Sequence, residues 1–370
     1  MWDVAIVGAG PAGSAAALAA LDAAPDAKVL LLDREEFPRD KACGDGIAPH
    51  ALEVLEHLGV SNAVAGFAPV QMLRLGFASG PQASGTMRRP AYVVPREIFD
   101  ARLVTAASER GATLRRHRVR RIERNRDAVI LDGEIAARVV VAADGANSVT
   151  RHLLYLGDTP RRHVAVAIRG YAPQPSAHHA TQVIMFADGV GWPGYAWSFP
   201  LGDGRANVGY GQVLRGGRAP ARGDLIRRLE AVLPGAAADA TRWRGHQLPL
   251  ASGRPRQPDG RVLFAGDALS LINPLTGEGI FYAVLSGALC GRIAVQPGTD
   301  AGARYRGALR SELGRHLRHT TAAAQFAASR WVVERAIRAG ADPRFFGDLV
   351  EVGLGRGTLT SRMIIELLRS

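Results

Sequence analysis

The sequence predicts an α/β fold: a parallel sheet flanked by helices, an inserted antiparallel sheet and a helical C-terminal segment. Three observations lead to this prediction. Residues 3–21 read as a buried strand, a glycine-rich turn and a helix of small residues, which is how doubly wound folds begin. Four strand-like runs, separated by Gly, Pro and Asp turns, follow between residues 163 and 214. Residues 302–338 read as one long, arginine-rich helix, with more helix over 348–370.

The composition is that of a globular chain of about two domains. The chain has 370 residues, of which 47% are hydrophobic and 22% charged. Cys43 and Cys290 are too few for a structural zinc site or a disulfide framework, so we expect no metal. The N-terminus lacks the basic start of a signal peptide, and no apolar run reaches the roughly 18 residues of a membrane span. We therefore expect a cytoplasmic protein.

The net charge of +12 comes almost entirely from arginine, since only Lys28 and Lys41 are lysines. The arginines of residues 114–126 would suit a phosphate or an anionic membrane surface. A strand at 118–124 with a solvated arginine face is the simpler explanation and the one that we favour. Nothing in the sequence is similar to a nucleic-acid-binding module, so we expect no nucleic-acid partner.

The glycines of the first turn indicate a Rossmann-like dinucleotide-binding domain. Gly8, Gly10 and Gly13 fit G-x-G-x-x-G, in which the glycines allow a tight turn, close approach of a pyrophosphate, and close helix–strand packing. A second buried strand, 28–34, ends in Asp33, 20 residues after Gly13, where a carboxylate accepts hydrogen bonds from a ribose. Further candidate cofactor contacts on these segments are Ala12 and Arg34.

Two later segments extend the pattern. A strand in residues 137–151 runs into Asp144-Gly145, and a strand in residues 261–294 ends in Gly266-Asp267 before a loop and a helix. With these motifs the sequence resembles the FAD-dependent oxidoreductases of the p-hydroxybenzoate hydroxylase type, also called the GR2 type. The resemblance covers roughly residues 1–295, with the three motifs in the family's order. It implies that FAD is the cofactor.

The resemblance also implies roles for individual residues. Asp33 would hold the adenosine ribose and Asp267 would hydrogen-bond the ribityl chain. The backbone of Gly277, Gly279 and Ile280 would cap the pyrimidine edge of the flavin, at a helix N-terminus suited to negative charge.

Other family motifs are present between these. Residues 93–103 match R-x-x-F-D, which places Arg96 near the cofactor and Phe99 and Asp100 in its supporting helix. Val119 stands where the family contacts adenine through the main chain. Asp144 would anchor the loop near the pyrophosphate, and Arg151 closes the family's D-G-x-x-S-x-x-R pattern.

This organisation implies a discontinuous cofactor domain. The expected divisions are the FAD-binding domain at 1–75, 93–160 and 259–300, the substrate-binding sheet at 76–92 and 161–258, and the C-terminal helical segment at 301–370.

The most informative stretch of the inserted sheet is Y-x-W-x-F-P at residues 195–200. Alternation along a strand puts Tyr195, Trp197 and Phe199 on one face. Such a row could simply fill the core between two sheets. Together with the stretch FPRDKACGDGI (37–47), however, it resembles the geranylgeranyl reductase subfamily, which uses reduced FAD to saturate isoprenoid double bonds. That resemblance implies a substrate cavity lined by the three aromatics, with Pro274 as a further candidate contact.

The role of Cys43 stays open between two explanations. A metal site lacks partner ligands, since His50 stands alone, and a nucleophile would need an adjacent base. What remains is a thiol at the flavin edge, or a small side chain packed beneath the ring. Ala42 and Cys43 are therefore candidate cofactor contacts.

These features favour an FAD-dependent reductase acting on a hydrophobic isoprenoid or related substrate, with NAD(P)H as the electron donor. Candidate catalytic residues are Cys43 and Tyr195 as proton donors, and Trp197. The runner-up is an FAD-dependent monooxygenase that uses NAD(P)H and O2, because the cofactor motifs suit it equally. A flavoprotein scaffold or redox sensor would leave the aromatic sheet without a purpose.

A flavin-dependent halogenase is a minor alternative, since halogenases share the superfamily and carry a comparable W-x-W-x-I-P segment. Their chemistry needs a lysine after the second strand. Here Lys28 starts a strand, Lys41 lies beside the Cys-Gly element, and no lysine follows. Tyr195 and Phe199 also depart from the halogenase pattern.

The C-terminal segment is expected to cover the cavity. Residues 302–338 carry an amphipathic stripe, and Gly340 and Pro343 end the helix. Its arginines and Trp331 would also suit a lipid headgroup region, so peripheral membrane contact is a second expectation. The oligomeric state is not predicted.

Overall fold

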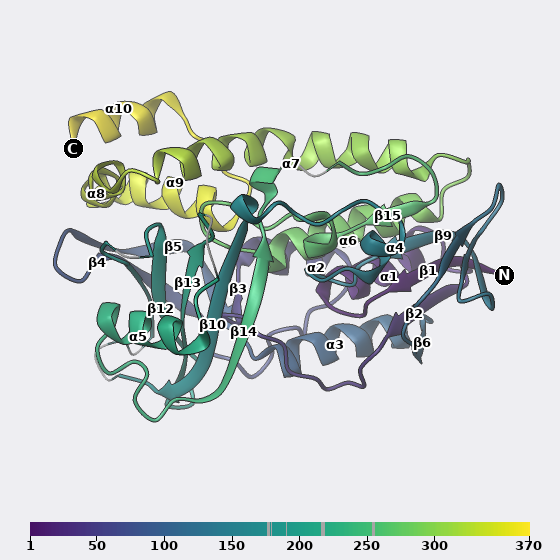
Figure 1. Ribbon diagram of the computed structural model, residues 1–370, viewed down its shortest axis with the longest axis horizontal. Coiled ribbons are helices and arrows are strands. Elements are labelled where there is room, and N and C mark those ends of the chain that lie inside the picture. Colours follow the sequence, from purple (N-terminus) through teal and green to yellow (C-terminus); the bar gives the residue numbers. More distant parts are fainter. Residues whose placement is uncertain (176–177, 179, 190, 216–218, 254–255) are drawn as a thin grey trace.

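The computed structural model describes residues 1–175, 178, 180–189, 191–215, 219–253 and 256–370. It contains two sheets, one of seven strands and one of eight. The C-terminal helices run over both of them (Figure 1). Helix α7 (Ala301–Phe326) contacts the first sheet and α9 (Pro343–Leu354) contacts the second. The α/β fold class predicted from the sequence is therefore confirmed.

The first sheet has a parallel core. Its strand order is β6 (Thr113–Arg116), β2 (Val29–Asp33), β1 (Trp2–Val7), β9 (Ile135–Ala142), β8 (Val129–Leu131) and β7 (Ile122–Arg124), and β15 (Val262–Phe264) pairs with β9. The pairs among β6, β2, β1, β9 and β15 are parallel, whereas β8 and β7 continue the sheet antiparallel. Strand β2 is buried throughout, which explains its unbroken apolar run.

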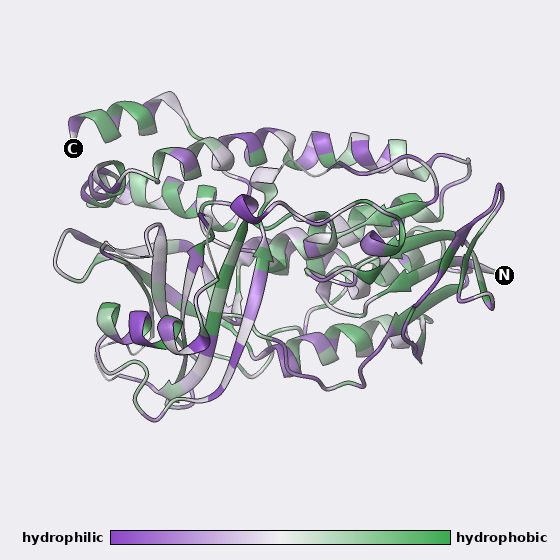
Figure 2. Cartoon of the chain, in the orientation of Figure 1, coloured by the Kyte–Doolittle hydropathy of each residue, from purple (hydrophilic) through white to green (hydrophobic). Residues whose placement is uncertain are grey.

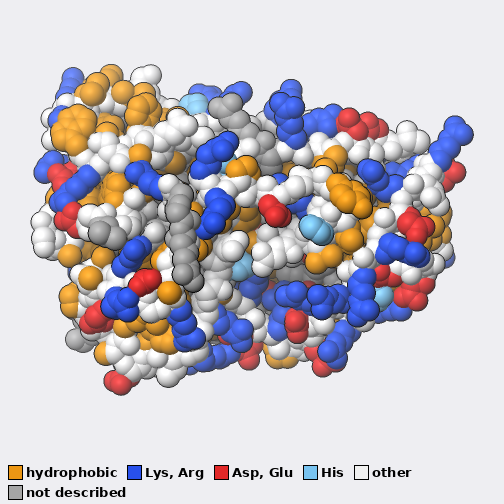
Figure 3. All heavy atoms as spheres, viewed as in Figure 1, with side chains coloured by type: hydrophobic (Ala, Val, Ile, Leu, Met, Phe, Trp, Pro, Cys, Tyr) orange, Lys and Arg blue, Asp and Glu red, His pale blue; other side chains and the backbone are white. Residues whose placement is uncertain are grey.

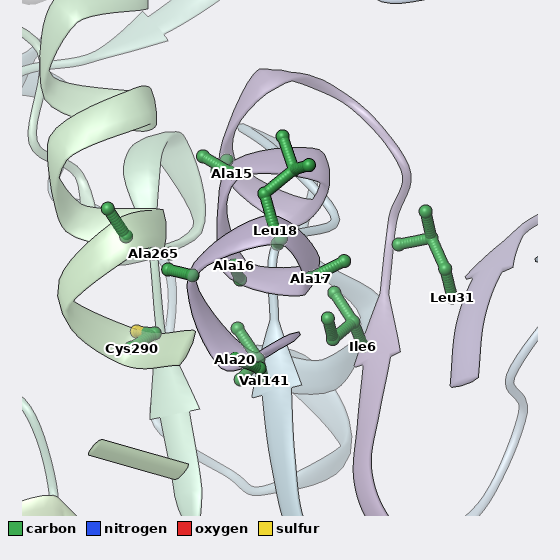
Figure 4. Close-up of a cluster of buried hydrophobic side chains, with 14 of the residues drawn as sticks. Ile6, Ala15, Ala16, Ala17, Leu18, Ala20, Leu31, Val141, Ala265 and Cys290 are labelled. Carbon is green, nitrogen blue, oxygen red and sulfur yellow. The ribbon is translucent and has the colours of Figure 1, made fainter. Parts of the chain in front are cut away.

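Helices α1 (Pro11–Ala23) and α6 (Ile280–Ala294) cover this sheet and pack tightly on each other. A Cβ atom at Gly287 would lie 2.1 Å from the carbonyl oxygen of Ala12, so only glycine permits this approach. Small side chains fill the contact, including Ala16, Ala20 and Cys290 (Figure 4). The small-residue helix expected after the glycine turn exists because α6 lies directly against it.

The strand expected at 118–124 is wrong for its first half, since only β7 (Ile122–Arg124) is strand. The backbone amides of Arg120 and Arg121 donate instead to one Asp132 carboxylate oxygen, at 2.9 and 2.7 Å. A side chain thus takes the bonds that a neighbouring strand would have supplied.

The second sheet is the inserted one. Its order is β14 (Thr241–Pro249), β10 (Val164–Pro173), β13 (Arg205–Val213), β12 (Gly194–Pro200), β11 (Thr181–Phe186), β4 (Val70–Phe77), β5 (Gln82–Val93) and β3 (Gly46–Ile47). All neighbours are antiparallel except β11 and β4. The earlier part of the chain therefore contributes β3, β4 and β5 to this sheet, and β4 begins at Val70, before the expected boundary at 76.

The other helices are α2 (Pro49–His57), α3 (Arg96–Glu109), α4 (Val149–Leu153) and α5 (Arg222–Val232). The helix expected over 302–338 is two helices, because α7 ends at Phe326 and α8 (Arg330–Ala339) starts after extended Ser329. The chain ends with α10 (Ser361–Arg369). Hydrophilic and hydrophobic residues alternate along α7, whereas the core strands of the first sheet are mostly hydrophobic (Figure 2). Among the described helices, none combines the length and apolar character needed to cross a bilayer.

Candidate cofactor and substrate site

A cavity of about 1200 Å³ lies between the two sheets and beneath the C-terminal helices. One side is formed by Gly10, Ala143 and Ala265, which follow the carboxyl ends of β1, β9 and β15. This is where open α/β sheets bind ligands. The opposite side is the face of the second sheet, including β12. The cavity thus joins the segments assigned to cofactor and substrate.

The glycine turn has the geometry expected of a pyrophosphate-binding turn. Gly8 has φ +101°, and a Cβ atom at Gly13 would lie 1.8 Å from the Gly8 carbonyl oxygen. The N-cap of α1 is Gly10, no side chain caps the helix, and Gly10, Pro11 and Ala12 line the cavity, so the uncapped amides of the first turn lie at the cavity wall. Such amides favour an anion. Ala12 lines the cavity in the same turn.

Two arginines lie beside this turn. A Cβ atom at Gly10 would be 3.6 Å from Arg39 Nη2 and 3.9 Å from Arg96 Nη2. Arg96 donates to both oxygens of buried Asp100 at 2.6 and 2.7 Å, and Arg39 Nη1 lies 3.1 Å from the same carboxylate. Two cations thus share one carboxylate next to the helix N-terminus. That arrangement fits the diphosphate of FAD.

Asp33 holds the glycine turn from the end of β2. One of its oxygens accepts the Ala9 amide at 2.9 Å and the other accepts the Glu35 amide at 3.0 Å. The neighbouring Arg34 extends into solvent and pairs with Glu35 at 3.5 Å, away from the cavity. Val119 is buried in the core of this domain. The ribose and adenine contacts assigned to Asp33 and Val119 stay predictions.

Within the mid-chain motif, Gly145 lines the cavity and Asp144 supports the site from outside it. Asp144 accepts Ser148 Oγ at 2.6 Å and the Thr150 amide at 2.9 Å, so it fixes the start of α4. Arg151 donates to Ser270 Oγ at 2.9 Å. This bond links α4 to the loop after β15. The hydrogen bond between Arg151 and Ser270 therefore holds the segments that follow β9 and β15 together beside the cavity.

Asp267 enters the cavity beside two basic groups that the motifs do not name. His246 Nε2, from β14, lies 3.9 Å from its carboxylate. Burial would raise the pKa of Asp267, but His246 and Lys41 outweigh it and hold that pKa below its usual value. Burial lowers the pKa of Lys41, against the attraction of Asp267. Lys41 lines the cavity, and a Cβ atom at Gly145 would lie 3.4 Å from its Nζ.

Removing the Asp267 carboxylate should weaken FAD binding. Loss of a charge-assisted hydrogen bond costs about 1.5–3 kcal/mol, which corresponds to roughly 10- to 100-fold in Kd. We expect this for Asp267→Ala, measured by titrating apoprotein with FAD. The matched control is Asp259→Ala, an exposed carboxylate just before β15. Equal FAD content and affinity in the two variants would refute the assignment.

The loop before α6 brings a second carboxyl into the cavity. Glu278 Oε1 accepts the Phe281 amide at 2.9 Å, at the N-terminus of α6. Burial raises the pKa of Glu278 to about 7, and the nearby charge of Asp267 adds to the rise. Gly277, Gly279, Ile280 and Pro274 line the cavity around it. The sequence drew attention only to the backbone of this loop, not to Glu278.

The aromatic strand forms the facing wall. Ring centroids of Tyr195 and Trp197 are 6.0 Å apart, and those of Trp197 and Phe199 are 6.4 Å apart. All three line the cavity, on one face as the alternation predicts. Tyr195 donates its hydroxyl to the Thr276 carbonyl at 2.5 Å, and Trp197 Nε1 donates to Asn207 Oδ1 at 2.9 Å. The wall is thereby fixed to the Glu278 loop.

The Cys43 stretch is tied to the same wall. Asn207 Nδ2 donates to the Cys43 carbonyl at 2.9 Å and to Asp45 Oδ2 at 2.8 Å, and Tyr171 donates to Asp45 at 2.5 Å. Burial raises the pKa of Asp45 to about 6, although both donors oppose the rise. Cys43 and Ala42 line the cavity, and burial raises the pKa of the thiol. Asp45 thus orients the segment that carries Cys43.

The structure gathers most of the predicted residues at one cavity. Those that line it are Gly10, Ala12, Ala42, Cys43, Arg96, Tyr195, Trp197, Phe199, Asp267, Pro274, Gly277, Gly279 and Ile280. Those that lie outside it are Gly8, Gly13, Asp33, Arg34, Val119 and Asp144. Sequence motifs did not identify Arg39, Lys41, Asp45, His246 or Glu278. Among the described residues, no three His, Cys, Asp or Glu side chains form a metal-binding group.

Comparison with known proteins agrees with this geometry. Residues 1–187 match the FAD binding domain family. The chain is 34% identical to the menaquinone reductase of Mycolicibacterium smegmatis, over 80% of this chain and 77% of that protein. It is 31% identical to digeranylgeranylglycerophospholipid reductase 1 of Methanopyrus kandleri, over 80% of each.

A solved structure shares the fold over the full length. The geranylgeranyl bacteriochlorophyll reductase-like protein of Thermoplasma acidophilum superposes with a TM-score of 0.78, at 20% identity, over 100% of this chain and 95% of that one. The glycine turn flanked by two arginines fits the diphosphate of FAD. The chain therefore belongs to the FAD-dependent oxidoreductases of the p-hydroxybenzoate hydroxylase-like superfamily, in the geranylgeranyl reductase-like subfamily.

Proposed function

We propose that this protein is a reductase that saturates a carbon–carbon double bond in the isoprenoid chain of a hydrophobic substrate, such as a prenylated quinone or lipid. NAD(P)H would supply the electrons. Two relatives whose names describe reduction of menaquinone and of a digeranylgeranyl phospholipid support this proposal. The cavity between a cofactor turn and an aromatic wall supports it independently.

The observation that carries the proposal is the close approach of the aromatic wall to the Cys43 stretch. A Cβ atom at Gly44 would lie 3.5 Å from the Phe199 ring and 3.5 Å from Trp197 Nε1. The aromatic rings therefore pack directly against the Cys43 stretch, and together they form one continuous, largely apolar wall of the cavity. An isoprenoid chain suits such a wall.

The residues divide the work of the reaction. Reduced FAD, when bound, would supply a hydride equivalent to one alkene carbon. Gly10, Arg39, Arg96 and Asp267 would hold the cofactor, and Trp197 and Phe199 would orient the chain against it. The second alkene carbon then needs a proton from a group placed at the wall.

Glu278 is the donor that we propose, in place of Tyr195 or Cys43. The Tyr195 proton is engaged with the Thr276 carbonyl, and burial raises the pKa of that phenol. Burial also raises the pKa of the Cys43 thiol. The carboxyl of Glu278 lines the cavity with its pKa raised to about 7, so near neutral pH a large share of it carries a proton that it can release.

The proposal is tested by the product. Enzyme whose flavin has been reduced in the absence of oxygen is mixed with menaquinone or a geranylgeranyl lipid. The mass of the product is then measured by mass spectrometry. We expect a gain of two hydrogen atoms under nitrogen. A product that forms only in air and carries an added oxygen atom would show a monooxygenase instead.

A further inference from the structure

The cavity reaches the protein surface at the C-terminal helices. Five large apolar side chains are exposed there; we call them the apolar portal, and they are Phe326 (63%), Trp331 (57%), Ile364 (51%), Ile365 (48%) and Leu368 (65%). All except Ile365 also line the cavity. Side chains that line a cavity and face solvent mark its mouth. One mouth of the cavity therefore opens between the end of α7, α8 and α10.

These side chains are held in place. Arg335, from α8, donates through Nε to the Leu367 carbonyl at 2.8 Å and also bonds the Leu368 carbonyl, which fixes the end of α10. Its guanidinium stacks over the Trp331 ring at 4.7 Å. On the other face of α10, Met363 is buried. The helix is thus anchored by one face and presents Ile364, Ile365 and Leu368 outward.

Charge surrounds the portal. Residues 301–370 hold twelve arginines against six acidic residues, so this part of the chain carries +6 of the total +12. Arg338, Arg362 and Arg369 are exposed around the apolar side chains. Figure 3 shows hydrophobic side chains gathered over α10 at the upper left, with arginines around them. An exposed apolar face with Trp and a basic rim is the pattern of helices that lie in a membrane interface.

We propose that the apolar portal docks on an anionic bilayer, with the cavity mouth opening into the lipid. Resting on the proposed function, this gives an isoprenoid chain a route from the membrane to the flavin without crossing water. A second copy of the chain is a poorer occupant, because pairing two portals would place two arginine-rich rims against each other. A bilayer supplies both apolar depth and negative headgroups.

The test is vesicle co-sedimentation of the FAD-loaded protein without substrate or turnover, so its result does not depend on the reductase activity. Vesicles contain phosphatidylcholine alone or mixed with phosphatidylglycerol. We expect binding to the anionic vesicles that weakens as salt rises. The triple variant Trp331→Ser/Ile364→Ser/Leu368→Ser should bind these vesicles at least about tenfold more weakly. Each lost apolar side chain removes apolar surface that the bilayer would otherwise bury.

The matched control is Tyr155→Ser, which removes a side chain that is 96% exposed elsewhere on the molecule. FAD content and melting temperature confirm that each variant is folded. Equal vesicle binding by wild type, triple variant and control would overturn the proposal. So would wild-type protein that ignores vesicles but dimerises through the portal, seen by light scattering as a dimer that the triple variant loses.

Discussion

Glu278→Gln should lower the rate of substrate reduction by at least about 100-fold, the usual contribution of a positioned general acid. Glutamine is close in size and its amide oxygen can still accept the Phe281 amide, so the loop before α6 should keep its shape. The rate to measure is oxidation of pre-reduced enzyme by substrate under nitrogen, because this isolates the step that consumes the proton. FAD content should be unchanged.

The pH dependence follows from the direction of the Glu278 shift. Burial raises its pKa to about 7, so the carboxyl is protonated below that value and loses its proton as pH rises through it. The wild-type rate should therefore be highest below about pH 7 and fall above it. In Glu278→Gln this fall of the rate above about pH 7 should be absent.

Two conservative variants serve as controls for this assignment. Tyr195→Phe and Cys43→Ser remove the donors that the sequence suggested. We expect each to keep most of the rate and the same pH limb. The assignment is wrong if either variant lowers the rate of substrate reduction more than Glu278→Gln does. It is also wrong if Glu278→Gln keeps the wild-type pH profile, because the proton then comes from another group.

Arg96→Met should destabilise the apoprotein by about 3–5 kcal/mol, as removal of one partner of a buried ion pair does. Asp100 is fully buried and would lose both of its Arg96 bonds, keeping only Arg39 at 3.1 Å. Denaturant unfolding of FAD-free protein measures this loss without the contribution of cofactor binding.

A second change separates stability from cofactor contact. The double variant Arg96→Met/Asp100→Asn removes the stranded charge, so it should recover much of the stability and still bind FAD weakly. Arg102→Met, on the same helix, loses bonds to the Asn62 and Ala63 carbonyls and a contact with the Phe67 ring, but it strands no buried charge and should be near wild type. If the single variant Arg96→Met is as stable as wild type, the ion pair between Arg96 and Asp100 does not contribute to the stability of the apoprotein.

Local constraints made much of this fold predictable. The close approach of Gly13 to the Gly8 carbonyl requires a glycine, and burial of β2 on both faces requires an unbroken apolar run. Each of these signals can be recognised within a few residues of the sequence. The shared face of Tyr195, Trp197 and Phe199 follows from the two-residue period of a strand. Such features need no knowledge of distant segments.

Long-range packing hid the rest. The Asp45 carboxyl meets Tyr171 and Asn207 from strands more than a hundred residues away, and only the assembled sheet brings them together. The pKa of Glu278 depends on burial by several segments, which no short motif encodes. The same applies to residues 118–121, where Asp132 displaces the expected strand bonds.

The most direct test of the central claim is the reoxidation of the flavin itself. Enzyme reduced and kept under nitrogen is mixed with menaquinone or a geranylgeranyl lipid in a stopped-flow instrument, and the yellow absorbance is followed. Our account predicts that the colour returns without oxygen, at a rate at least equal to turnover and in proportion to the alkene saturated. Flavin that stays bleached with the alkene present, and regains its colour only when oxygen is admitted, would contradict it.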